Sequence, residues 1–275
     1  MFNRGIEGWD IALKFSISNI AWAAHDDERM FKFLSEHGFG GLEIAPTRIF
    51  PVDPYLDLMR ARRFADHLRK DYSLVICSMQ SIWFGRSERV FGTAEDRRIL
   101  TNYTELALCF AEAVGVSNLV FGNPKNRRQD SPNLMDASGL DFMREIAEAA
   151  LCHGTIISLE PNPETYGTNW VTSTLQAFDL VRAVNHPALR VNFDLGTVLI
   201  NGEDLSTLAD NFDLIHHVHV SEPGLEPVVP RAIHRDLARI LSDHGYDGWI
   251  SIEMKNCGSL DAVESAAGHL REVFP

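Results

Sequence analysis

The chain has 275 residues, of which 45% are hydrophobic and 23% are charged, with 25 Lys and Arg against 38 Asp and Glu. The resulting net charge of −13 disfavours binding to a nucleic-acid backbone or to an anionic membrane surface. The four cysteines lack CxxC spacing, and we find neither a signal-peptide core in residues 1–15 nor an apolar run of membrane-spanning length, so we expect reduced thiols and a cytoplasmic location.

Short apolar runs, several of them rich in β-branched residues, recur along the chain, and each is followed by a polar loop. Where such runs alternate with longer amphipathic stretches, they are typical of βα units and a parallel sheet. In chain order, the predicted strands span Lys14–Ser18, Gly41–Ile44, Leu74–Met79, Asn118–Phe121, Ile156–Leu159, Arg190–Phe193, Ile215–Val220 and Trp249–Glu253.

Amphipathic stretches between these runs predict helices in residues 26–38, 95–115, 173–187 and 260–274. Several of them carry signals for their ends. Gly38 and Gly115 stand where a helix C-terminus favours glycine, while Ser173 and Gln176 have the spacing of a capping box and Pro187 ends the same stretch.

The number and spacing of the predicted strands favour one closed α/β domain. Eight units in 275 residues give 275/8, about 34 residues each, which is typical of a single (β/α)8 TIM barrel. We expect one domain over residues 1–275, with the barrel itself at about 14–274. An open doubly wound sheet is the alternative, but no GxGxxG turn follows the first strand.

The last four predicted strands end in polar residues that a packed interior would not tolerate alone. They are Glu160, Asp194, His219 and Glu253. Strand ends converge near the axis at the mouth of a barrel, and buried carboxylates there must be protonated or neutralised by a cation. We therefore expect one divalent metal ion, with Mn²⁺, Mg²⁺, Co²⁺ and Zn²⁺ all compatible with three oxygen ligands and one imidazole.

With these residues, the sequence resembles the xylose isomerase-like TIM barrels, the sugar phosphate isomerase/epimerase family, over about residues 14–255. The ordered set Glu160, Asp194, His219 and Glu253, with spacings of 34, 25 and 34 residues, is similar to the metal set of the sugar epimerase branch. In that branch both glutamates also act as acid and base on opposite faces of the substrate. The resemblance thus implies catalytic roles for Glu160 and Glu253.

Two positions depart from the pattern of this family. Thr197 stands where many members have a histidine three residues after the metal-binding aspartate, and Tyr166 stands where ketose 3-epimerases have a second glutamate. The metal site therefore transfers to this chain better than the substrate pocket does.

Further residues near the predicted barrel mouth are candidates for substrate binding. His217 shares a strand face with His219, Lys255 follows Glu253 with the same parity, and Asn162 likewise follows Glu160. Glu43 ends the second strand, Tyr166 lies in the loop after the fifth, and Arg127 belongs to a basic loop, residues 125–128. Because Arg127 and Lys255 could pair with an anion, we expect a substrate that carries phosphate or carboxylate.

These residues support a metal-dependent sugar isomerase or epimerase that transfers protons between carboxylates through a metal-stabilised enediolate. The alternatives are a dehydratase or lyase acting on a keto-inositol or keto-acid sugar, and a noncatalytic sugar-binding barrel that retains the metal. We expect a small sugar or sugar derivative as partner, with neither nucleic acid nor membrane, and self-association into a homo-oligomer remains open.

Overall fold

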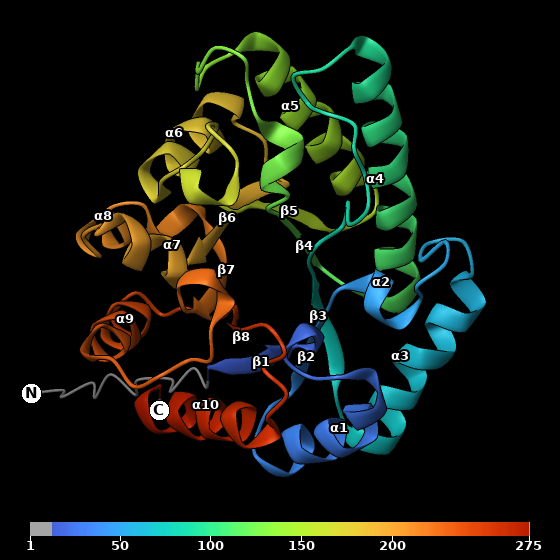
Figure 1. Ribbon diagram of the computed structural model, residues 1–275, viewed down its shortest axis with the longest axis vertical. Coiled ribbons are helices and arrows are strands. Elements are labelled where there is room, and N and C mark those ends of the chain that lie inside the picture. Colours follow the sequence, from blue (N-terminus) through green and yellow to red (C-terminus); the bar gives the residue numbers. More distant parts are fainter. Residues whose placement is uncertain (1–12, 275) are drawn as a thin grey trace, which may run out of the picture.

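The protein is a closed barrel of eight parallel strands in sequential order, each neighbour hydrogen-bonded to the next and β8 to β1 (Figure 1). The computed structural model describes residues 13–274, so the expectations for residues 1–12 lie outside the described part. The closed parallel sheet confirms the predicted single (β/α)8 TIM barrel. None of the helices in the described part has the length and hydrophobicity needed to span a bilayer.

The strands agree with the predicted runs to within about one residue at each end. The main differences are at β3, which begins after Leu74, and at β6 and β7, which continue to Asp194 and Ser221. The strands are β1 Lys14–Ser18, β2 Gly41–Ile44, β3 Val75–Met79, β4 Asn118–Phe121, β5 Ile156–Leu159, β6 Leu189–Asp194, β7 Ile215–Ser221 and β8 Trp249–Glu253.

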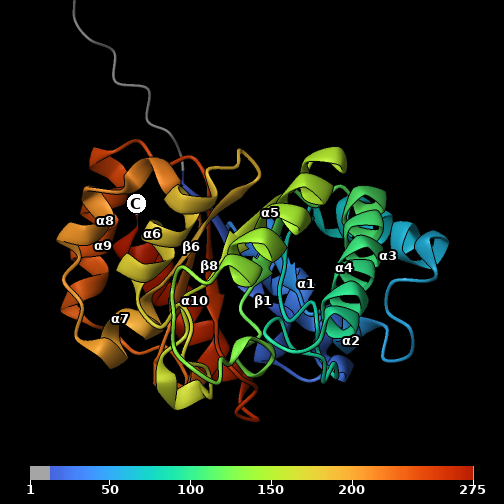
Figure 2. The ribbon, with the colours of Figure 1, turned by 90° about the horizontal axis from the view of Figure 1, so that it is seen from above.

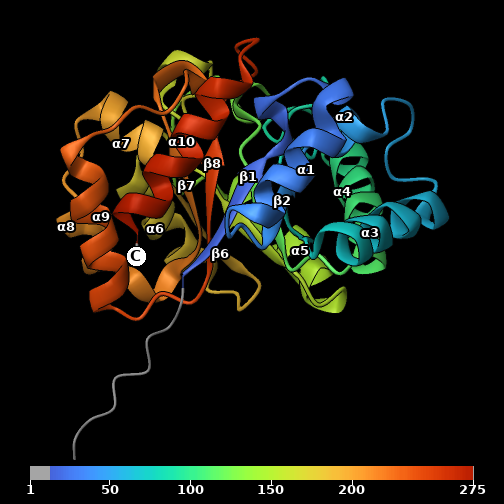
Figure 3. The same ribbon diagram turned by 90° about the horizontal axis from the view of Figure 1, so that it is seen from below.

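Helices surround the barrel as an outer layer, as the two views turned by 90° show (Figures 2 and 3). The longer helices are α1 Asp27–Glu36, α3 Leu58–Tyr72, α4 Ala94–Val114, α5 Ala137–Cys152, α6 Thr174–Val184, α9 Ala232–Asp243 and α10 Leu260–Val273. Shorter ones are α2 Pro46–Ile49, α7 Leu195–Asn201 and α8 Ser206–Ala209. Helices α1 and α10 lie side by side and are joined by an ion pair of Arg29 and Glu264 at 2.8 Å (Figure 1).

Side-chain caps fix where several helices begin. A full capping box is present at α4, where Thr93 and Asp96 each accept a hydrogen bond from the other's backbone N–H. At α6 the predicted pair is only half formed. Ser173 accepts from the N–H of Gln176, but the Gln176 carboxamide accepts from the N–H of Thr172 instead of that of Ser173.

Many side chains inside the barrel are polar, which explains why polar and apolar residues alternate along the strands. Asn118 donates to Ser78 at 2.9 Å and accepts from Ser158, which links three adjacent strands, while Gln80 donates to Ser18 at 3.0 Å. Alternate residues of a strand point to opposite faces, so the intervening side chains pack outward against the helices. These fully buried residues include Phe15, Ile17, Leu42, Ile44, Val191, Phe193, Val218, Val220, Ile250 and Ile252.

Candidate metal centre and active site

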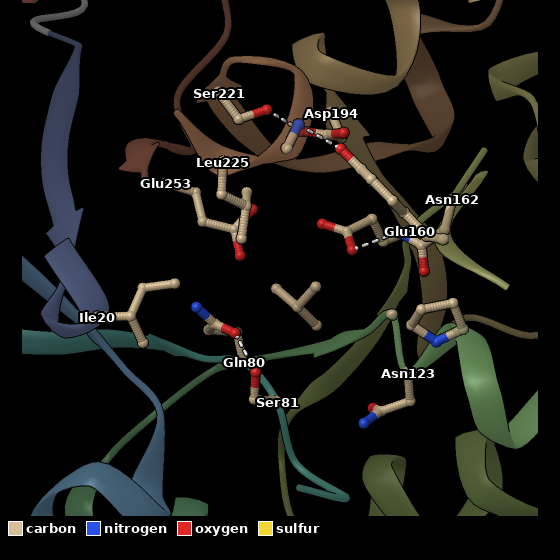
Figure 4. A pocket seen from close by; sticks show the side chains of 15 residues that line it. Ile20, Gln80, Ser81, Asn123, Glu160, Asn162, Asp194, Ser221, Leu225 and Glu253 are labelled. Carbon is tan, nitrogen blue, oxygen red and sulfur yellow. Dashed lines mark hydrogen bonds between the residues drawn. The ribbon is translucent and has the colours of Figure 1, made fainter. Parts of the chain in front are cut away.

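A cavity of about 320 Å³ opens at the carboxyl ends of the strands, where TIM-barrel enzymes have their active sites (Figure 4). Glu160 and Asp194 reach it from the ends of β5 and β6, and Glu253 from the end of β8. His219, on β7, is fully buried beside them. One potential ligand atom from each of the four residues lies within 4.8 Å of all the others, so the structure brings the predicted set together.

Neighbouring polar groups hold the first two carboxylates in place. Asn192 and Asn162 each donate to one oxygen of Glu160, at 2.8 and 2.9 Å. Asp194 caps α7, where its Oδ2 accepts from the backbone N–H of Thr197 at 2.8 Å, and its Oδ1 accepts from the Ser221 hydroxyl. Each carboxylate is therefore oriented before any ligand binds.

The orientation of His219 is set from below by Glu43. His219 Nε2 donates to Glu43 Oε2 at 2.9 Å, and His217 Nε2 donates to the same oxygen at 3.0 Å. His219 Nδ1 consequently faces the cluster, 3.0 Å from Glu160 Oε1 and 3.3 Å from Glu253 Oε2. A carboxylate that holds the outer nitrogen of a ligating histidine fixes its tautomer and ring angle.

Glu43 and His217 are not on the cavity wall, contrary to the expectation that they contact substrate. The Glu43 side chain has no exposed surface and that of His217 is 1% exposed, and neither lines the cavity. One oxygen of Glu43 accepts hydrogen bonds from both His217 and His219, so Glu43 contacts the cluster through His219.

Burial dominates the electrostatics of the cluster. It raises the pKa of Glu253 to about 7, with a contribution from the charge of Glu160, and it also raises the pKa of Asp194. Burial would likewise raise the pKa of Glu160, but hydrogen bonds from His219 and Asn162 and the positive charges of His219 and Arg127 outweigh burial and lower it. Burial would lower the pKa of His219, but the charges of Glu43 and Glu253 and the hydrogen bonds to Glu160 and Glu253 raise it. The cluster therefore favours positive charge at its centre.

This donor set fits a divalent cation. Three buried carboxylates repel one another unless a cation lies among them, and the imidazole nitrogen that faces them is oriented as a ligand. The oxygen-rich set with one nitrogen is compatible with Mn²⁺, Mg²⁺, Co²⁺ and Zn²⁺, in agreement with the expectation from the sequence.

Asn162 and Tyr166 both line the cavity, and their contact with substrate stays a prediction. Asn162 is buried and donates to Glu160, while the Tyr166 hydroxyl accepts from the backbone N–H of Gly224 at 2.8 Å. That hydrogen bond joins the loop after β5 to the loop after β7 across the mouth. At the other departure from the family pattern, the Thr197 hydroxyl lies within hydrogen-bond distance of Asp194 Oδ2, at 2.7 Å.

The expectation that Arg127 and Lys255 face a substrate anion is not met by their positions. Arg127 is fully buried, and its Nη2 donates to the Glu160 carbonyl and to Asn162 Oδ1, each at 2.7 Å. Burial lowers its pKa to about 10. Lys255 is about half exposed and pairs with Glu226. Neither side chain lines the cavity.

The cavity also includes polar residues that we did not select from the sequence, namely Gln80, Ser81, Asn123 and Ser221. For two of these residues, the position in the sequence could have indicated a place at the cavity. Gln80 directly follows β3, and Ser221 lies two residues after His219 on the same face of β7, so the strand-end rule applied to all eight strands would have found them. Asn123, in a left-handed backbone conformation after β4, had none.

Gly122 allows the Glu160 carboxylate to approach the wall of the cavity. A Cβ at this position would fall 2.6 Å from Glu160 Oε2, well inside van der Waals contact. Any larger residue would therefore displace a proposed metal ligand.

A model of the xylose isomerase-like TIM barrel matches residues 31–273 of this chain. The chain belongs to the xylose isomerase-like TIM-barrel family. This match confirms the resemblance drawn from the four residues at the strand ends. A search of curated proteins found no match.

Several solved structures of this family have the same fold. A 3-keto-D-glucoside 4-epimerase from E. coli is 19% identical, with 95% of this chain and 98% of that chain covered and a TM-score of 0.73. A D-psicose 3-epimerase with D-tagatose, from Clostridium cellulolyticum H10, is 14% identical, with 95% and 99% covered and a TM-score of 0.77. A probable 3-DHS dehydratase from Bacillus anthracis is 17% identical, with 94% and 99% covered and a TM-score of 0.69.

Proposed function

We propose that this protein is a divalent-metal-dependent isomerase or epimerase of an uncharged sugar or sugar derivative. The observation that carries the proposal is the placement of two glutamates at one cavity. Glu160 from β5 and Glu253 from β8 direct their carboxylates into the same space from different sides (Figure 4), beside Asp194 and His219. The similarity to two sugar epimerases agrees with this chemistry.

The two glutamates would act as the base and the acid. One carboxylate removes the proton from the carbon next to the substrate carbonyl, and the other returns a proton to the opposite face or to the adjacent carbon. The first outcome is epimerisation and the second is aldose–ketose isomerisation. A bound divalent ion would supply positive charge to the carbonyl and hydroxyl oxygens of the substrate.

Asymmetric surroundings suit the two glutamates to different roles. Glu160 accepts hydrogen bonds from Asn192 and Asn162, which favour its charged form. In the metal-free protein, burial raises the pKa of Glu253, at the end of β8, to about 7. Because the two amide donors favour a charged Glu160, we assign the initial base to Glu160 and the initial acid to the second carboxylate, Glu253.

The lining of the cavity favours an uncharged substrate, in place of the anionic one expected from the sequence. Its side chains are carboxylates, amides, hydroxyls and apolar groups, and no lysine, arginine or histidine is among them in the described residues. A phosphate or carboxylate remote from the metal would meet no cationic partner there, and would lose its hydration without compensation. The hydroxyl groups of an uncharged sugar can form hydrogen bonds with Gln80, Asn162 and Tyr166 in the lining.

The proposal is tested by incubating the metal-loaded protein with free ketoses, aldoses, keto-glycosides and their phosphates in deuterated water. We expect deuterium at the carbon next to the carbonyl and a new epimer or isomer, from uncharged sugars in preference to phosphorylated ones. NMR spectroscopy reads both outcomes. Loss of water with formation of an enone would instead identify a dehydratase, and binding without exchange would identify a noncatalytic barrel.

A further inference from the structure

A second group of potential metal ligands lies on the outer layer of the barrel, between α4 and α5. Glu105 and Cys109 are one helical turn apart on α4, and His153 directly follows the end of α5. One potential ligand atom from each of the three lies within 4.8 Å of the other two. The C-termini of both helices precede strands, so the group is at the end of the barrel opposite the cavity mouth.

The local geometry resembles a prepared metal site more than a chance ion pair. His153 Nε2 lies 2.8 Å from Glu105 Oε1, whereas His153 Nδ1 donates to Glu112 Oε2 at 2.7 Å. Glu112 therefore holds the outer nitrogen of the ring, as carboxylates do for ligating histidines. The contact is similar to the one that Glu43 makes with His219 beneath the cavity.

The surroundings also favour a cation here. The His153 side chain is only 15% exposed, so the ring is held between the helices while one side of the group remains open to solvent. His153 is the C-cap of α5, so the negative end of the α5 dipole lies at the group. Sulfur, imidazole nitrogen and carboxylate oxygen together are the ligands that zinc prefers in proteins.

We propose that Glu105, Cys109 and His153 form a second metal site, specific for zinc and similar ions, which joins α4 to α5. The site is independent of the cavity, and solvent completes its coordination. Because its three ligands come from two neighbouring helices, the bound ion stabilises their packing in the folded chain and raises the melting temperature.

Cobalt provides a spectroscopic probe that separates this site from the cavity cluster. A thiolate bound to Co²⁺ gives a charge-transfer absorption in the near ultraviolet, and the cavity cluster contains no sulfur. We expect the full-length, metal-stripped protein to develop this absorption when Co²⁺ is added, and Zn²⁺ to displace it. Elemental analysis after zinc loading should give two ions per chain.

Variants distinguish the proposed ligands from other cysteines. Cys109→Ser and His153→Gln should each abolish the cobalt absorption and reduce bound zinc from two ions to one. Cys257→Ser, which alters an exposed thiol outside the group, should retain both the cobalt absorption and two bound zinc ions. His219→Gln, which alters the cavity cluster, should also retain the cobalt absorption. Absence of the absorption in the unmodified protein, or its persistence in the folded Cys109→Ser or His153→Gln variant, would overturn the proposal.

Discussion

Replacement of Glu43 by Gln should weaken metal binding without removing any ligand. The Glu43 carboxylate has no exposed surface, and one of its oxygens accepts hydrogen bonds from both His217 and His219. The amide keeps the size of the side chain but removes the charge that fixes the His219 ring. Loss of a carboxylate behind a ligating histidine typically costs 10- to 100-fold in affinity, which is about 1.4 to 2.8 kcal/mol.

Competition with a fluorescent chelator measures this affinity directly. We expect Glu43→Gln to recover most of its turnover when the metal concentration is raised, because Glu43 is fully buried and does not line the cavity. The matched control is Ser251→Ala, whose hydroxyl lies 3.5 Å from the other oxygen of Glu43 and should change affinity by less than about threefold. Wild-type metal affinity in a folded Glu43→Gln variant would refute the supporting role.

The remaining predictions concern the cavity. Glu253→Gln keeps one ligand oxygen but removes a proton-transfer group, so kcat should fall by about 100-fold or more while part of the metal affinity remains; unchanged kcat excludes it from the chemistry. Gly122→Ala places a Cβ 2.6 Å from Glu160 Oε2 and should lower kcat/KM at least tenfold, whereas Gly268→Ala in α10, where a Cβ meets nothing within 4 Å, should leave activity unchanged and stabilise the fold. Removal of the metal by a chelator should abolish turnover and lower the melting temperature, and added Mn²⁺ or Co²⁺ should restore both; activity that survives complete removal would contradict the metal-dependent mechanism.

Apolar runs and the spacing between them were sufficient to predict the order of the strands and the closed barrel. The clustering of Glu160, Asp194, His219 and Glu253 was also predictable, because each ends or nearly ends a strand, and strand ends of a barrel meet at one face. Their role as metal ligands stays a prediction. The acid and base roles of the glutamates stay predictions. They depend on the chemistry of a bound substrate, which positions along a chain do not specify.

The sequence by itself determined which residues alternate inward and which strands carry them, since side-chain direction in a strand follows parity. Only the tertiary structure decided how deep each side chain lies. Strands in a barrel are tilted and staggered, so Glu43, although it nearly ends β2, reaches across to His219 below the cavity. Arg127 likewise belongs to a basic loop that we expected to face a substrate anion, yet the η3 turn Pro124–Arg127 directs it inward to the backbone of Glu160. Hydrogen-bonding partners distant in sequence determine such positions.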